Sequence, residues 1–168
     1  SNTRIEAFTQ REAIEEHPKL KDDADLIRDA DPLTEQGRRA YEQYYAQLSK
    51  WQDVAGEAME NGSRVPTRPK LPGIAGMWRG SSQFFNGKIA PVIPYAIRGT
   101  IWCQGTSNSG DGRIYAARME ALMRGWRDAW GMPEMPFYFT QMQCYGSPDP
   151  NNVGFADIRQ VQHLFFTR

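Results

Sequence analysis

The sequence predicts an α/β fold built on a parallel sheet, with a helical insertion at about residues 20–62. Two observations lead to this fold class. From residue 84 onward, short apolar runs alternate with helical patterns, and a strand, helix, strand, helix order is typical of a parallel sheet with right-handed crossovers. Before residue 64 the periodicity is helical, and a Pro/Gly-rich stretch separates the two parts.

Composition and charge limit the classes of function. The 168 residues are 40% apolar, and 20 basic residues balance 20 acidic ones. A balanced charge gives no long-range attraction to nucleic acid or to an anionic membrane. No run of about 18 apolar residues is present, so we expect no membrane span. The sequence therefore favours a globular domain with no nucleic-acid or membrane partner, and it leaves the oligomeric state open.

The start of the chain and its two cysteines give little functional information. Ser1-Asn2 resembles the remnant of a cleaved tag, so we expect a piece of a longer protein whose localisation the sequence does not reveal. Cys103 and Cys144 are too few for a disulfide scaffold or a zinc knuckle. They either form one disulfide or remain two small buried thiols, and the frequent burial of free cysteine favours the second interpretation.

The N-terminal elements are predicted from capping signals. Thr9, with Glu12 in the capping-box position, predicts the start of a short helix. His17 precedes a proline at the expected helix end, which favours a solvated C-terminal cap. The aspartates between residues 22 and 31 lack the glycine and final glutamate of a calcium loop, so we expect a solvated acidic turn.

A long amphipathic helix of about 26 residues is predicted between Thr34 and Gly62. Its apolar residues recur at steps of three and four: Tyr41, Tyr44, Leu48, Trp51, Ala55 and Met59. This spacing favours a stripe that packs on the body of the protein, although aromatic faces also stack on sugars. The Pro/Gly-rich loop at 63–83 is either a domain linker or a loop over the catalytic surface.

The α/β portion covers residues 84–168. Buried strands are predicted at 97–104 and 137–142, and amphipathic helices at 115–130 and 155–165. Ligands of parallel sheets bind beyond the carboxyl ends of the strands. We therefore expect the ends near Gln104 and Gln141 to be adjacent and open to solvent, and residues 104–111 and 141–150 to form the site.

The first strand end carries the most informative side chains. Gly105 permits a tight turn, and the Asn108 amide either caps a turn or stabilises an oxyanion. We expect Asn108 to be a loop amide at a cleft, with little effect on stability. Gln104 and Gln141 either tie the strand ends together or hold substrate. Arg159 either pairs with an acid, Asp157 or Asp111, or reaches a ligand.

Several blocks of this chain resemble one enzyme family. Residues 102–108, WCQGTSN, resemble the WYQGESN block of the sialate O-acetylesterase family, which belongs to the SGNH hydrolases. Residues 85–99, FNGKIAPVIPYAIRG, resemble its YNGMIAPLIPYAIRG block, and residues 136–141, PFYFTQ, resemble PFYFVQ. Residues 156–162 are similar to its LREAQ block, and residues 3–8 are similar to the stretch after its WGG. The resemblance extends over nearly the whole chain.

The resemblance implies a fold and an activity. It implies a three-layer α/β/α (flavodoxin-like) SGNH hydrolase, with residues 1–168 part of one domain. The implied activity is serine-dependent hydrolysis of acetyl esters on sugars such as sialic acid, with no metal or cofactor and a secreted or periplasmic parent. By position, Asn108 is the implied oxyanion donor. The residues implied to bind substrate or support the active site are Gln104, Gly105, Thr106, Asn86, Gln141 and Arg159.

Three departures from the family pattern qualify this implication. The family's nucleophile block lies upstream of residue 1, its Asp-x-x-His block lies downstream of residue 168, and Thr106 stands where the family has Glu. A triad within this chain is not supported. His17 is expected to cap a helix end and His163 to be a core or surface histidine, and no Gly-x-Ser-x-Gly elbow is present. We therefore expect the isolated chain to be inactive. The alternative is a non-catalytic module that binds carbohydrate or a partner through Tyr44, Trp51 and Trp78.

Overall fold

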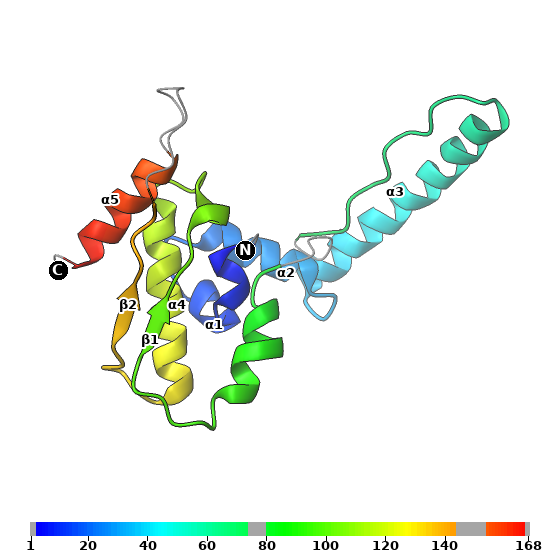
Figure 1. The fold of residues 1–168 in the computed structure, drawn as a ribbon. Helices are drawn as coiled ribbons and strands as arrows, with labels where there is room; N and C mark the ends of the chain where they lie inside the picture. The colour runs from blue at the N-terminus through cyan, green and yellow to red at the C-terminus, as the bar shows by residue number, and fades with distance from the viewer. Residues whose placement is uncertain (1–2, 74–79, 144–153, 167–168) are drawn as a thin grey trace. The chain divides into compact units, whose positions relative to one another are not determined.

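The computed structural model describes residues 3–73, 80–143 and 154–166, and it divides into two compact units. The first unit combines residues 1–21 with 81–168, and the second is residues 22–80. Its helices and strands, labelled in Figure 1, are α1 (Arg11–Glu15), α2 (Lys21–Ala30), α3 (Glu35–Glu60), β1 (Thr100–Trp102), α4 (Ile114–Trp130), β2 (Phe137–Phe139) and α5 (Gly154–Phe166). Short 3-10 or π turns cover Ile5–Phe8, Phe85–Ile89, Ala90–Val92 and Thr106–Asn108.

The predicted parallel pairing of the two strands is confirmed. Strands β1 and β2 form a two-stranded parallel sheet in which Ile101 lies opposite Tyr138. Both strands are shorter than predicted, with three residues each. The last inter-strand bond runs from the Thr140 N–H to the Trp102 carbonyl, and beyond it the chain turns at Gly105. The described residues thus form a mostly helical α/β structure with a small sheet.

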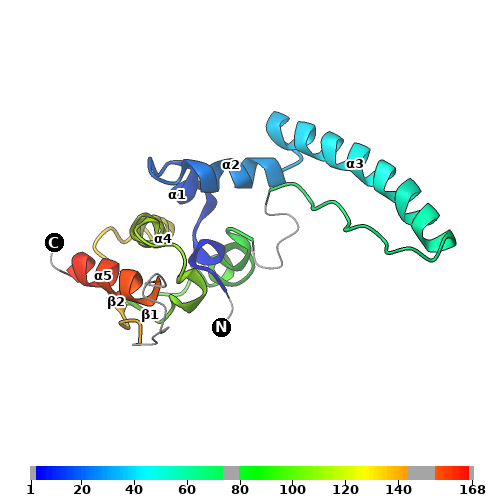
Figure 2. The same cartoon turned by 90° about the horizontal axis from the view of Figure 1, so that it is seen from above.

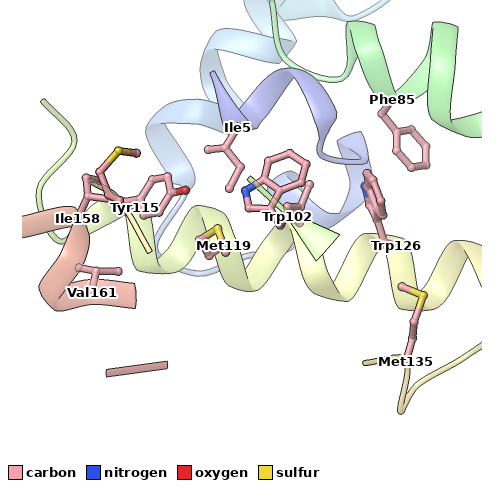
Figure 3. Packing of buried hydrophobic residues seen from close by; sticks show 11 residues of the cluster. Ile5, Phe85, Trp102, Tyr115, Met119, Trp126, Met135, Ile158 and Val161 are labelled. Carbon is pink, nitrogen blue, oxygen red and sulfur yellow. The ribbon is translucent and has the colours of Figure 1, made fainter. Parts of the chain in front are cut away.

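Helix α4 packs against one face of this sheet and contributes more residues to the buried hydrophobic cluster than any other element. Trp102 of β1 meets Trp126 of α4 edge to face at 6.0 Å, and Trp126 meets Phe137 of β2 at 5.8 Å. Figure 3 shows Trp102 and Met119 packed together above α4. Because burial of large apolar side chains is the main stabilising term in a small domain, these contacts hold the strands on the helix.

The other face of the sheet is open. Ile101 is 79% exposed and Tyr138 is 62% exposed, and the two are register partners. Alternate residues of a strand point to opposite faces, so both side chains lie on the face away from Trp102. The prediction of two buried strands is therefore wrong, because both β1 and β2 expose side chains on this face.

The two C-terminal helices start and end within one residue of their predicted positions. Gly131 ends α4 in the left-handed region with φ +62°, which glycine adopts without a Cβ penalty. At the start of α5, Gly154 approaches another loop so closely that a Cβ there would lie 2.1 Å from the Ser109 carbonyl oxygen. A glycine at this position therefore lets α5 pack beside the turn that contains Asn108.

Two predictions for the N-terminal segment are wrong. Thr9 does not cap α1; its hydroxyl donates to the Ile5 carbonyl, and α1 begins after Gln10 without a side-chain cap. His17 is not a solvated cap, because its side chain is largely buried and its Nε2 lies 3.2 Å from a Glu120 carboxylate oxygen on α4. The Thr9 hydroxyl is satisfied by a nearby main-chain carbonyl of its own segment. His17 instead packs against α4, a tertiary partner that sequence spacing does not reveal.

The second unit contains the predicted long helix. Thr34 caps α3 by accepting a hydrogen bond from the Gly37 N–H, and the helix has 26 residues as predicted. Figures 1 and 2 show the chain returning alongside α3 after its end. Trp51 donates its indole N–H to the Pro66 carbonyl, and Arg68 donates to the hydroxyl of buried Tyr44. The aromatic stripe therefore packs on this returning segment.

The acidic segment before α3 is mainly helical. Asp22, Asp23, Asp25 and Asp29 lie on α2, where a solvated turn was expected. None of the helices in the described ranges is long and apolar enough to cross a membrane.

Candidate functional site

A cleft of about 340 Å³ lies where the two parallel strands end. It is lined by residues 103–106, which follow β1, and by residues 140–143, which follow β2. The sequence prediction that these ends are adjacent and open is confirmed. The cleft is the position where a parallel sheet offers loops of different strands to one ligand.

Cys103 lies in the wall of this cleft. It is an exposed free thiol, so the preferred interpretation of two buried thiols is wrong for this residue. In a strand, successive side chains alternate between faces. Cys103 follows buried Trp102 and therefore points away from the core. Cys144 lies outside the described residues.

Asn108 lies beneath the cleft loop and is fully buried. Its Oδ1 accepts hydrogen bonds from the Ile5 N–H at 2.9 Å and from Gln104 Nε2 at 2.7 Å. Its Nδ2 donates to Glu6 Oε2 at 2.9 Å and to Asp111 Oδ2 at 2.6 Å. With two donors on one side and two carboxylates on the other, only one orientation of the amide satisfies every partner.

Four charged side chains surround the Asn108 amide. Arg4 contacts both Asp111, at 2.7 Å, and Glu6, at 3.1 Å. Arg118 also contacts both carboxylates, lying 2.8 Å from Glu6 Oε1. Each guanidinium thus bridges two carboxylates, and the cluster is neutral in sum. Pairing of this kind is what permits charges to be buried, because an isolated buried charge is strongly destabilising.

This geometry changes the structural role expected for Asn108. The expectation that it is a loop amide at the cleft surface, with little effect on stability, is wrong, because the side chain is buried with four hydrogen bonds. Its assignment as oxyanion donor stays a prediction. Donation to a substrate oxygen would require one Nδ2 proton to leave Glu6 or Asp111.

Gln104 ties the strand end to two other segments. Its Nε2 donates to the Thr3 carbonyl at 3.0 Å and to Asn108. The hydroxyl of buried Tyr115 lies 3.1 Å from the Gln104 carbonyl oxygen and 3.2 Å from its Oε1. Burial raises the pKa of the Tyr115 hydroxyl above its usual value, so this group is a neutral donor at physiological pH. Of the two roles considered for Gln104, the structural one is therefore present.

The remaining predicted residues fall into two groups. Gly105, Thr106 and Gln141 line the cleft. Asn86 and Arg159 do not: Asn86 is exposed on the Phe85–Ile89 turn, and Arg159 of α5 donates to the Gln143 carbonyl at 3.4 Å. The predicted pairing of Arg159 with an acid is replaced by this main-chain contact.

Sequence reasoning missed the side chains that hold the site together. Glu6 and Arg118 were not predicted, and Asp111 was considered only as a partner of Arg159, although it follows Asn108 by three residues within the same loop. Gln162 was also missed; it is buried, and its Oε1 accepts the Met142 N–H at 2.8 Å. A buried glutamine on an otherwise apolar helix face is the signal that could have identified it, because buried amides require partners. Among the described residues, no three His, Cys, Asp or Glu side chains cluster as metal ligands would.

Comparison with known proteins gives two related matches. The chain is similar to the sialate O-acetylesterase of Rattus norvegicus, with 33% identity over 93 residues, which cover 51% of this chain and 17% of that protein. It is also similar to the sialate O-acetylesterase of Mus musculus, with 29% identity over 93 residues and the same coverage. The chain thus spans about one sixth of the length of these relatives. No family model matches the chain, and no solved structure matches it.

Proposed function

We propose that this chain is the central portion of a serine-dependent carbohydrate O-acetylesterase, a hydrolase that removes acetyl groups from sugars. The observation that carries the proposal is the cleft at the ends of β1 and β2, whose wall is formed by residues 103–106 of the family-like WCQGTSN block. Similarity to two sialate O-acetylesterases supports the same class of reaction.

The open face of the sheet supports placement within a larger domain. Parallel sheets are normally covered on both faces, whereas Ile101 and Tyr138 are largely exposed here. We infer that further segments of the complete protein cover this face and give the three-layer α/β/α arrangement of SGNH hydrolases. Residues 1–168 would then belong to one domain, with α2, α3 and the segment to residue 80 as an insertion.

The proposed reaction uses groups beyond residues 1–168. A serine adds to the carbonyl carbon of the acetyl ester, and a histidine accepts the serine proton and returns it to the departing sugar hydroxyl. Water then attacks the acetyl-serine and releases acetate. Within this chain, the cleft residues Gly105, Thr106 and Gln141 would contact the substrate, and Gln104 and Arg159 would hold the cleft walls.

Asn108 is the proposed oxyanion donor, through one of its two amide protons. The Thr3–Ile5 segment and the carboxylates of Glu6 and Asp111 already fix the direction of that amide. An Nδ2 proton that leaves Glu6 or Asp111 would stabilise the negative charge that develops on the ester oxygen in the transition state. An oxyanion donor acts on kcat more than on KM.

The competing hypothesis of a carbohydrate-binding module is less well supported. It relied on the aromatic residues of α3, but Tyr44 is buried and the Trp51 indole N–H is bonded to the Pro66 carbonyl. Trp78 lies outside the described residues. The stripe is therefore used for packing within its own unit.

Hydrolysis of p-nitrophenyl acetate tests the proposal. The complete protein should hydrolyse it and the isolated chain should not exceed the protein-free rate. In the complete protein, Asn108→Ala should lower kcat by about 10²–10³ with little change in KM, measured on protein shown by circular dichroism to be folded. Wild-type kcat in folded Asn108→Ala would contradict the oxyanion role.

Thr106→Glu restores the residue that the family has at this position. An increase in activity would indicate that the complete protein is weakened by the missing carboxylate. A serine-dependent burst from the isolated chain would overturn the assignment of the nucleophile to another part of the protein.

A further inference from the structure

The lining of the strand-end cleft contains no charged side chain among the described residues. Residues 103–106 and 140–143 supply a thiol, amides, hydroxyls, a glycine and a thioether. This is unusual for the molecule, since 24% of its residues are charged. A second groove of about 390 Å³, between α4 and α5, is lined by four charged side chains: Lys19, Arg113, Glu120 and Asp157.

The charged side chains around the buried side of the cleft loop have other partners. Arg4, Glu6, Asp111 and Arg118 pair with one another around Asn108. Arg159 contacts a cleft residue, but it does so by donating to the Gln143 carbonyl, and its side chain is not part of the lining. None of these cations is among the described residues that line the cleft.

The chemistry of the lining suits hydroxyl groups. Gln141 is exposed, and its side-chain amide has no hydrogen-bond partner within the described ranges, so it offers both donors and an acceptor. Within the described part of the chain, the exposed Thr106 hydroxyl makes one weak contact, at 3.8 Å to the Met142 sulfur. A carboxylate placed here would lose water without gaining a cation, which is costly, whereas sugar hydroxyls would exchange water for amide and hydroxyl partners.

We propose that the cleft binds an uncharged acetylated sugar in preference to a carboxylate-bearing one such as sialate. This inference rests on the proposed esterase function, because it names the substrate class of the same site. Because neither the described lining nor an uncharged sugar carries a charge, binding of that sugar should be insensitive to salt.

Binding to the 168-residue chain tests the inference without any hydrolysis. The probes are methyl 2-O-acetyl-glucopyranoside, which is uncharged, and 9-O-acetyl-N-acetylneuraminate, which carries a carboxylate. In NMR titrations the uncharged probe should shift the amide signals of residues 103–106 and 140–143, and its Kd should be at least about tenfold lower than that of the anion. The Kd should be unchanged between about 0.02 and 0.5 M NaCl, because salt screens only charged partners.

A charge introduced into the lining should reverse the preference. Gln141→Arg should improve binding of the anionic probe by about tenfold at low salt and restore a salt dependence. Gln160→Arg is the matched control, since Gln160 is an exposed glutamine that lines the α4–α5 groove instead, and it should leave both Kd values unchanged.

The inference would be overturned if the wild-type chain bound the anionic probe more tightly than the uncharged one. If that binding were weakened by salt and lost in Arg159→Gln, carboxylate recognition would be assigned to Arg159. Absence of binding by either probe would also overturn it. If the complete protein hydrolysed no acetyl ester, the proposed function would be wrong. Selective binding of the uncharged probe would still establish the binding preference of the cleft.

Discussion

The two sides of the loop from Gln104 to Asp111 differ sharply in chemistry. On the buried side, Asn108 is enclosed by two carboxylates and two guanidiniums, and all of these side chains have partners. On the open side, the same loop forms one wall of the cleft, whose described lining residues are uncharged. In the proposed function, the charged side chains would fix the loop and the neutral polar groups would contact the ligand.

Removal of one guanidinium from the buried cluster should have the largest effect on the free energy of unfolding. Arg118→Met leaves Glu6 and Asp111 with Arg4 alone, and Arg4 is partly exposed. Loss of one partner from a buried ion pair costs about 3–5 kcal/mol, so we expect a decrease of this size in the free energy of unfolding, measured with urea. Arg124→Met is the control, because Arg124 pairs with exposed Glu16 and should lose no more than about 1 kcal/mol.

Asn108→Ala should have the next largest effect on stability. The substitution leaves the Ile5 N–H and two carboxylates without their buried partner, and we expect a loss of more than about 2 kcal/mol. Asn86→Ala, at an exposed asparagine outside the cleft, should change stability by less than about 0.5 kcal/mol. Equal stability of the two variants would show that the charged cluster does not depend on the amide.

A substitution at the start of α5 tests whether the packing of that helix supports the loop. A Cβ at Gly154 would lie 2.1 Å from the Ser109 carbonyl oxygen, whereas one at Gly110 would meet nothing within 4 Å. Gly154→Ala should therefore cost about 1–3 kcal/mol by overpacking, while Gly110→Ala should be nearly neutral. Thermal unfolding of the two variants in parallel provides the comparison.

The smallest expected effect is a pH dependence from Tyr115. Burial raises the pKa of this hydroxyl in the folded state, so the unfolded chain releases the proton first as pH rises. The stability is therefore fully present below the unfolded pKa of about 10 and falls above it by about 1.4 kcal/mol per pH unit. Urea unfolding at several alkaline pH values should show a weaker decline in Tyr115→Phe than in the wild type.

The sequence was most informative where its pattern is local. The start of α3 after Thr34 and the end of α4 at residue 130 depend on few neighbours, and both were predicted. The parallel strands were also predicted, because their apolar runs alternate with helices. The charged cluster was not, since Glu6 and Arg118 are more than a hundred residues apart and only the fold brings them together. The same reason explains why His17 took a tertiary partner.

Alkylation of Cys103 tests most directly whether the strand-end cleft is the place of reaction. Its thiol is free, exposed and part of the cleft wall, so N-ethylmaleimide should fill the cleft. We predict that the complete protein loses most of its acetyl-ester hydrolysis after modification, that an uncharged acetylated sugar slows the loss, and that Cys103→Ala remains active after the same treatment. Full activity with Cys103 completely alkylated would contradict the account.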